Sequence, residues 1–132
     1  MLITGGIRYD SKKSGKQDYR NFVTEYSMSG FVAEWPELNE ARGWHGCGRT
    51  GETLVVAGGR GTSYADQNYL STTEVLRPGS PAWVTVSSEP SRYIYWATIS
   101  NIAGKLFLTD SSKGQFIFFL SFVFASLNSC SL

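Results

Sequence analysis

The sequence predicts an all-β fold built from antiparallel four-stranded sheets. Short apolar or alternating runs recur at intervals of roughly 8–15 residues, turn residues separate them, and no stretch shows the 3.6-residue period of an amphipathic helix. The aromatic fraction of 14% and the 14 glycines agree with this prediction, because aromatic residues favour strands and glycine favours tight turns. The 132 residues suffice for one domain or less.

Each expected strand is a short run that ends at Gly, Pro or a polar stretch. In chain order, the expected strands are residues 2–6, 22–28, 31–35, 43–49, 53–59, 71–76, 82–86, 93–100 and 104–109. Residues 7–21 are polar and predict a long loop, and a second polar loop is expected at 60–70. Apolar residues make up 42% of the chain and charged residues 17%, which argues against disorder.

The second half of the chain repeats the order of the first with a period of about 50 residues. Five pairs of markers carry this period: Gly5-Gly6 with Gly58-Gly59, Thr24-Glu25 with Thr73-Glu74, Trp35 with Trp83, Arg42 with Arg92, and Leu54-Val55-Val56 with Leu106-Phe107-Leu108. A repeat of this length indicates a stacked or circular arrangement of similar sheets. The repeat therefore favours a β-propeller over a sandwich or a closed barrel.

The order Arg, apolar strand, Gly-Gly, long loop, Thr-Glu-Val and Trp resembles the kelch repeat. The resemblance covers roughly residues 1–110, and residues 42–83 contain every element once. The chain departs from the family pattern where Leu76 stands at the usual tyrosine and where Asp110-Ser111 replaces the third diglycine. The resemblance implies a partial kelch-type β-propeller, whose blades are antiparallel four-stranded sheets.

The expected blades divide the chain into four parts. Residues 1–41 form a partial blade that lacks its innermost strand, 42–91 a complete blade, 92–113 the start of a third, and 114–132 an apolar tail outside the repeat. In the complete blade we expect Trp83 to fill the wedge between blades and Glu74 to accept hydrogen bonds from backbone or Arg groups. One complete blade cannot close a propeller, so we expect self-association through open blade edges or membership of a longer protein.

The tail contains a run of about 12 apolar, Phe-rich residues, which is shorter than the ~20 that a membrane-spanning helix needs. No Lys or Arg follows it, so a membrane anchor is the less favoured interpretation. A buried strand or helix that replaces missing propeller structure is an alternative. The favoured hypothesis is a non-kelch end to an incomplete chain.

The residues that suggest catalysis or metal binding do so weakly. His45 and Cys47 lie close in sequence, but the chain has one His and two Cys, whereas zinc needs three or four ligands. The run GGRGTS at 58–63 lacks the Gly-Lys-Ser/Thr ending of a phosphate loop. We therefore expect no catalytic residue, metal or cofactor, and assign His45 to the inner strand of a blade.

The loops after Gly6 and Gly59 are the candidate binding sites. The kelch resemblance implies that these loops line one face of the propeller and contact partners. Tyr and Arg are enriched at binding hot spots. The candidate residues are Arg8, Tyr9, Arg60, Tyr64, Asp66, Gln67, Asn68 and Tyr69.

The resemblance implies a protein–protein interaction scaffold, such as the substrate receptor of a ubiquitin ligase. The formal net charge of +1 gives no basic field for nucleic acid, and the N-terminus lacks the features of a signal peptide, so a cytoplasmic protein is expected. Two alternatives stay open: a fragment of a galactose-oxidase-like or sugar-binding propeller, and a truncated product without function. The copper site of those oxidases uses two His, whereas this chain has one.

Overall fold

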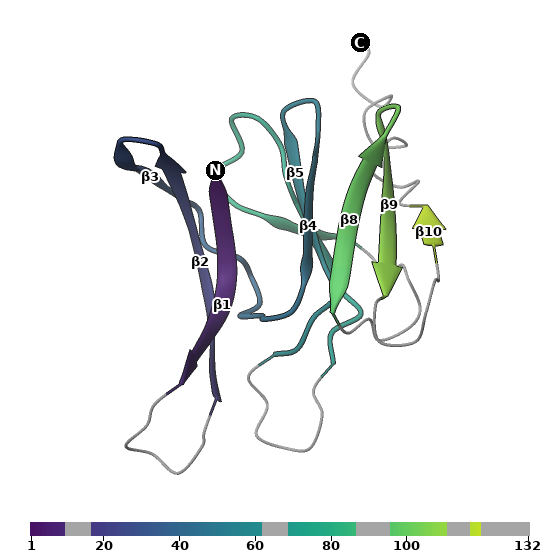
Figure 1. Ribbon diagram of the computed structural model, residues 1–132, viewed down its shortest axis with the longest axis horizontal. Helices are drawn as coiled ribbons and strands as arrows, with labels where there is room; N and C mark the ends of the chain where they lie inside the picture. The colour runs from purple at the N-terminus through teal and green to yellow at the C-terminus, as the bar shows by residue number, and fades with distance from the viewer. Residues whose placement is uncertain (10–16, 62–68, 87–95, 111–116, 120–132) are drawn as a thin grey trace.

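The computed structural model confirms an all-β, antiparallel fold of three sheets that stand side by side (Figure 1). It describes residues 1–9, 17–61, 69–86, 96–110 and 117–119. No helix occurs among these residues. The innermost-strand candidates 93–95, the marker Arg92 and most of the apolar tail lie outside the described residues.

The first sheet contains three strands in the order β1-β2-β3: β1 Leu2–Tyr9, β2 Gln17–Ser27 and β3 Gly30–Trp35. The predicted loop at 7–21 is wrong at both ends, because β1 continues through Tyr9 and β2 begins at Gln17. A register shift between Thr4 and Gly6 lets β1 continue past its diglycine. Ile7 then pairs with the buried Tyr19, and these two residues stabilise this part of the hairpin. The polar residues around them had led to the prediction of a loop.

The second sheet is the complete four-stranded unit that the sequence predicted. Its strands are β4 Gly46–Thr50, β5 Thr53–Ala57, β6 Thr73–Leu76 and β7 Val84–Val86, hydrogen-bonded in chain order. Each is shorter than expected, and β4 begins after His45 rather than at Gly43. All four residues of β6 are buried, and so are four of the five in β5, because this sheet has neighbours on both faces.

The third sheet has the order β10-β9-β8, with β8 Ala97–Ile102, β9 Lys105–Asp110 and β10 Ile117–Phe119. The last strand predicted from the sequence ends at residue 109, and the apolar tail 114–132 was expected to lie outside the repeat. Instead, Ile117 pairs with Thr109 and Phe119 with Phe107, so the Phe-rich segment supplies a third strand. The high strand propensity of Ile and Phe explains this pairing.

Two hydrophobic clusters, one on each face of the second sheet, hold the three sheets together. Toward the first sheet lie Val23, Leu38, Val56, Leu76 and Trp83. Toward the third sheet lie Val55, Ala57, Val75, Ile99, Leu106 and Leu108. Consecutive residues of β5 point to opposite clusters, as side-chain alternation in a strand requires. This stacking of sheet on sheet is the arrangement of adjacent blades in a β-propeller.

Gly48 lets the inner strands of the second and third sheets approach closely. A Cβ atom on Gly48 would collide with Cγ2 of Ile99 on β8, and one on Gly46 would lie 2.9 Å from Cγ1 of the same side chain. The bare backbone of β4 therefore forms the surface on which Ile99 packs. At the ends of the two hairpins, Asn101 Nδ2 donates to the carbonyl oxygen of Arg49 at 2.7 Å, which fixes their alignment.

The repeat between the second and third sheets is structural as well as sequential. Val56 pairs with Cys47 and Leu108 pairs with Ile99, so each residue of the first pair lies 52 residues before its counterpart in the second pair. Trp44 and Trp96 share this spacing, and both have a positive φ, 52° and 55°, just before the innermost strand. This pair of tryptophans is not among the five pairs of markers that predicted the repeat.

Two of the predicted markers do not occupy equivalent places in the first and second sheets. Trp35 pairs with Val23, whose side chain faces the second sheet, whereas Trp83 packs back toward the first sheet. Glu25 and Glu74 likewise point to opposite faces of their sheets. A one-residue offset in a strand moves every side chain to the opposite face of the sheet. Identical residue types at a similar spacing therefore do not show that two positions are structurally equivalent.

Candidate interaction surfaces

The predicted binding residues Arg60 and Tyr69 lie at the base of the loop that follows β5. Arg60 exchanges two backbone hydrogen bonds with Gly43, each of 2.9 Å, and forms a further bridge with Tyr69. Both side chains are half-buried. The structure thus brings Arg60 and Tyr69 together on a fixed backbone at the loop base.

The other predicted binding residues are placed only in part. Arg8 and Tyr9 end β1, where their backbones pair with Asp18 and Gln17. This end of β1 and the segment of Arg60 lie at the same end of the sheets (Figure 1). Tyr64, Asp66, Gln67 and Asn68 lie outside the described residues.

Gly59 allows the chain to leave β5 at this point. Its φ is +93°, and a Cβ atom would lie 2.5 Å from the carbonyl oxygen of Gly43 and 2.9 Å from Cβ of His45. Only glycine combines this conformation with so close an approach. The diglycine therefore has a structural role: it brings the loop base against the start of the second sheet.

A buried ion pair stands at the junction of the first and second sheets. The side chains of Arg42 and Glu74 are both 0% exposed, and Arg42 Nη2 lies 2.7 Å from Glu74 Oε1. Glu74 also accepts backbone hydrogen bonds from Asn39 at 2.6 Å and Glu40 at 3.1 Å. The expectation that Glu74 accepts from backbone and Arg groups is confirmed. Because charge-assisted hydrogen bonds surround both groups, the pair can exist without water.

Arg42 also connects the linker to the second sheet. Its Nη1 donates to the carbonyl oxygen of Gly58 at 2.8 Å and to that of Thr72 at 3.2 Å. Its own backbone N–H donates to Arg20 in β2 at 3.0 Å, and its carbonyl oxygen accepts from Gly6 in β1 at 2.9 Å. One residue thus fixes the ends of two diglycine strands, which positions both predicted loops.

His45 packs beside this network. Its Nε2 lies 2.8 Å from Thr4 Oγ1 in β1, and its Nδ1 is buried with no hydrogen-bond partner. Burial and, to a smaller extent, the positive charge of Arg42 lower the pKa of His45 from 6.5 to about 4. Neutral His45 is therefore a packing element between the first two sheets. Among the described residues, no group of three or more His, Cys, Asp or Glu side chains forms a metal site.

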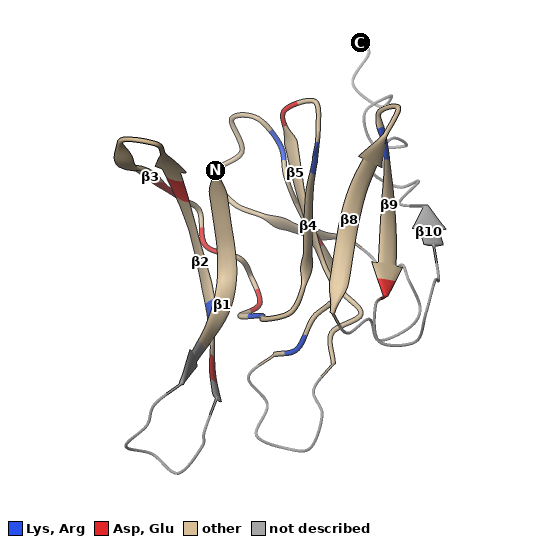
Figure 2. Cartoon of the chain, in the orientation of Figure 1, with Lys and Arg blue, Asp and Glu red and all other residues tan. Residues whose placement is uncertain are grey.

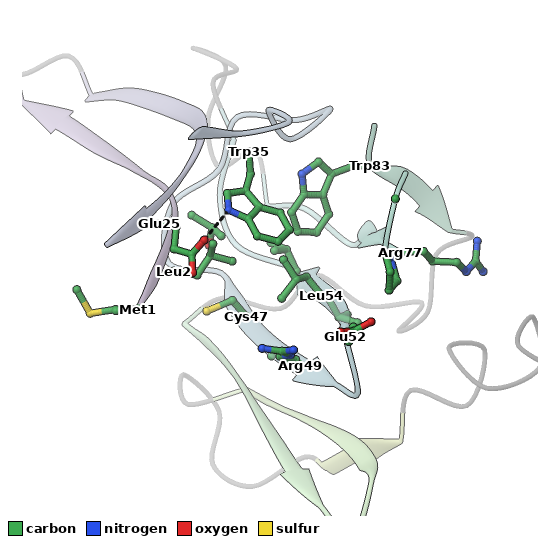
Figure 3. A pocket seen from close by; sticks show the side chains of 16 residues that line it. Met1, Leu2, Glu25, Trp35, Cys47, Arg49, Glu52, Leu54, Arg77 and Trp83 are labelled. Carbon is green, nitrogen blue, oxygen red and sulfur yellow. Dashed lines mark hydrogen bonds between the residues drawn. The ribbon is translucent and has the colours of Figure 1, made fainter. Parts of the chain in front are cut away.

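A groove of about 600 Å³ opens between the first and second sheets (Figure 3). The apolar part of its lining includes Leu2 on β1, Leu54 on β5, and the two indoles of Trp35 and Trp83. Cys47 on β4 is an exposed free thiol on the same wall as Arg49. This groove was not predicted from the sequence, although the expectation that the first blade lacks its innermost strand was a signal for it.

Charged residues of both signs are interspersed and lie mainly near turns and strand ends (Figure 2). The groove itself contains both Arg49 and Arg77 and both Glu25 and Glu52, so its lining has no dominant sign. In the part of the chain that the structure describes, no helix has the length and apolar character to cross a membrane.

Comparison of the chain with models of known protein families finds no match, and comparison with curated proteins finds none either.

Proposed function

We propose that this chain is part of a kelch-type β-propeller that acts as a cytoplasmic protein–protein interaction scaffold. The observation that carries the proposal is the repeated sheet unit, in which the two diglycine strands, β1 and β5, run toward the same end of the stacked sheets (Figure 1). Binding loops on a rigid β-scaffold are a common basis of recognition. Arg60 and Tyr69 are of the residue types that dominate binding energy at interfaces.

The rigidity of the loop base supports this role. Arg60 is held on both sides, by Gly43 and by Tyr69, and Gly43 is next to the buried Arg42. A side chain on a fixed backbone loses less conformational entropy when a partner binds, which favours affinity. We propose that the partner is a protein whose surface complements the half-buried cation of Arg60 and the aromatic ring of Tyr69.

The test places a photo-crosslinking amino acid at position 69 and, as a control, at position 26 near the opposite end of the first sheet. Proteins captured from cytosol at position 69 but not at position 26 are then purified and their affinities measured directly. Arg60→Glu should weaken binding by about tenfold or more, as expected for a hot-spot residue. Arg77→Glu, at the other end of the second sheet, should leave affinity unchanged.

The proposal fails if purified candidates bind the Arg60→Glu variant as tightly as the original chain. It also fails if capture at position 69 yields only other copies of this chain. In that case the loop end is a self-association surface rather than a site for a different protein.

A further inference from the structure

The free edge of β1 borders the groove between the first and second sheets. β1 is the terminal strand of its sheet, and no described strand pairs with its other edge. The hydrogen bond of 2.8 Å from the backbone N–H of Tyr26 to the carbonyl oxygen of Met1 sets the phase of pairing with β2. Because antiparallel pairing uses alternate residues, Leu2 and Thr4 turn their N–H and C=O groups toward the free edge.

The other two sheets show what lies at this position. β4 pairs antiparallel with β5, and β8 pairs antiparallel with β9. β5 and β1 correspond, since each leads into a diglycine and the loop behind it. Among the described residues, no strand takes the position in the first sheet that β4 and β8 take in the other two.

The interface between β4 and β8 specifies the chemistry of that strand. Ile99 of β8 rests on the bare backbone of Gly46 and Gly48 in β4. Cys47 is the counterpart of Ile99, because each pairs with the corresponding residue of the next strand. Cys47 faces the groove and is exposed, so its packing surface is unfilled.

We infer that the groove binds an extended polypeptide segment that adds to β1 as an antiparallel strand, with glycine or another small residue at the alternate positions that face Cys47. Backbone hydrogen bonds to Leu2 and Thr4 provide affinity, and the side-chain alternation provides selectivity. This binding mode goes beyond the proposed function, because the groove and the surface around Arg60 are separate.

The two ends of the groove limit the register of the added strand. The carbonyl oxygen of Arg42 already accepts the N–H of Gly6 at 2.9 Å, so the added strand stops short of Gly6. At the other end lie Glu52, Arg77 and Gly79, which belong to turns of the second sheet. The available length of β1 is thus Met1–Gly5.

The test uses a synthetic peptide with the sequence of residues 44–52, because this segment occupies the equivalent position in the second sheet. The peptide carries serine in place of its cysteine. The protein carries Cys130→Ser, so that Cys47 is its single thiol. The rate of Cys47 alkylation and the hydrogen exchange of the Leu2 and Thr4 amides are both measured. We expect both to slow by on the order of tenfold at saturating peptide.

Two control peptides separate strand addition from other binding. One has N-methyl groups on the peptide edge that would face β1, which removes its backbone donors. The other has valine in place of Gly46 and Gly48, which would collide with Cys47. We expect neither control to slow either process. The Arg60→Glu variant should bind the first peptide unchanged, so the outcome is independent of the proposed partner surface.

Three results would overturn the inference. The first is an unchanged alkylation rate at millimolar peptide. The second is equal protection by the valine peptide, which would make the groove an unselective apolar surface. The third is protection of Cys47 without slower exchange at Leu2 and Thr4, because a peptide that binds by side chains alone does not extend the sheet.

Discussion

Arg42 and Glu74 form an ion pair of 2.7 Å in which neither side chain is exposed, at the junction between the first two sheets. The pair lies between the ends of strands from both sheets, because Arg42 reaches Gly58 and Thr72 of the second sheet with its side chain. Its backbone bonds to β1 and β2 of the first sheet. Removal of one partner from a buried pair leaves an uncompensated charge, which is more costly than the loss of the attraction itself. The relationship makes the stability of the first sheet depend on that of the second.

We therefore predict that Arg42→Met lowers the free energy of unfolding by about 3–5 kcal/mol. Urea denaturation measures this, with trimethylamine N-oxide present in all samples to favour the folded state. The matched control is Arg20→Met, because Arg20 contacts Asp18 at 2.8 Å but both side chains are more than 40% exposed. This control should cost less than about 1 kcal/mol. Equal losses in the two variants would contradict a structural role for the buried pair.

The burial of His45 predicts a loss of stability in mild acid. The folded-state pKa is about 4, below the unfolded value of 6.5, so the unfolded chain takes up a proton first as the pH falls. The contribution of neutral His45 is fully present above about pH 6.5 and is lost as the pH falls toward 4. The loss is on the order of 3 kcal/mol.

His45→Gln removes this titration and should flatten the dependence of unfolding free energy on pH between 6.5 and 4. Denaturation at several pH values, with the original chain measured alongside, isolates the difference from the acid response of the carboxylates. A parallel pair of curves would show that His45 is as easily protonated in the folded chain as in the unfolded one.

The two tryptophans of the groove should differ in their contribution to stability. Trp83 is 3% exposed, packs on Val56 and donates from Nε1 to the carbonyl oxygen of Pro36 at 2.7 Å. Trp35 is 37% exposed and donates to Glu25. Trp83→Ala should cost roughly 3–5 kcal/mol. Trp35→Ala should cost about 1 kcal/mol, because less of its surface is removed from water. Thermal unfolding measures both, and a shift near zero for Trp83→Ala would contradict its position in the wedge between sheets.

The sequence predicted the second sheet well because the signals there are local. The apolar run at 53–57, the diglycine that follows it and the alternation within 73–76 depend on neighbouring residues alone. Hydrogen bonds between distant segments are different. The approach of Arg42 to Gly58 and of Asn39 to Glu74 could not be derived from spacing, although the role of Glu74 as an acceptor was expected from its position on β6.

Two of the mispredictions have a related physical cause. Neither the polarity of a segment nor a match of residue types shows whether it forms a strand and which face of the sheet its side chains occupy. Polar residues at 17–21 concealed a strand held by Tyr19. The match of Trp35 to Trp83 concealed a reversal of face. The groove depends on both effects, because it exists where Trp35 turns toward the second sheet and β1 has no inner neighbour among the described strands.

The outer face of the first sheet predicts self-association. On the face that points away from the second sheet, four large apolar side chains from three strands are exposed: Ile3, Phe22, Tyr26 and Phe31. Their rings and chains alternate with Leu2, Val23 and Glu25, which face the second sheet. The corresponding outer face of the second sheet, around Leu54 and Val56, is covered by the first sheet. An apolar sheet face of this kind drives association in solution.

We expect a mixture of monomer and larger species in sedimentation velocity at micromolar concentration. Phe22→Lys with Phe31→Lys should shift the distribution toward monomer, because two charges on this face oppose its burial. Ile102→Lys is the matched control: Ile102 is 58% exposed, but it lies at a hairpin end of the third sheet rather than on this face. An equal shift in the control would assign association to general surface hydrophobicity. An unchanged distribution in the double variant would place the contact on another part of the chain.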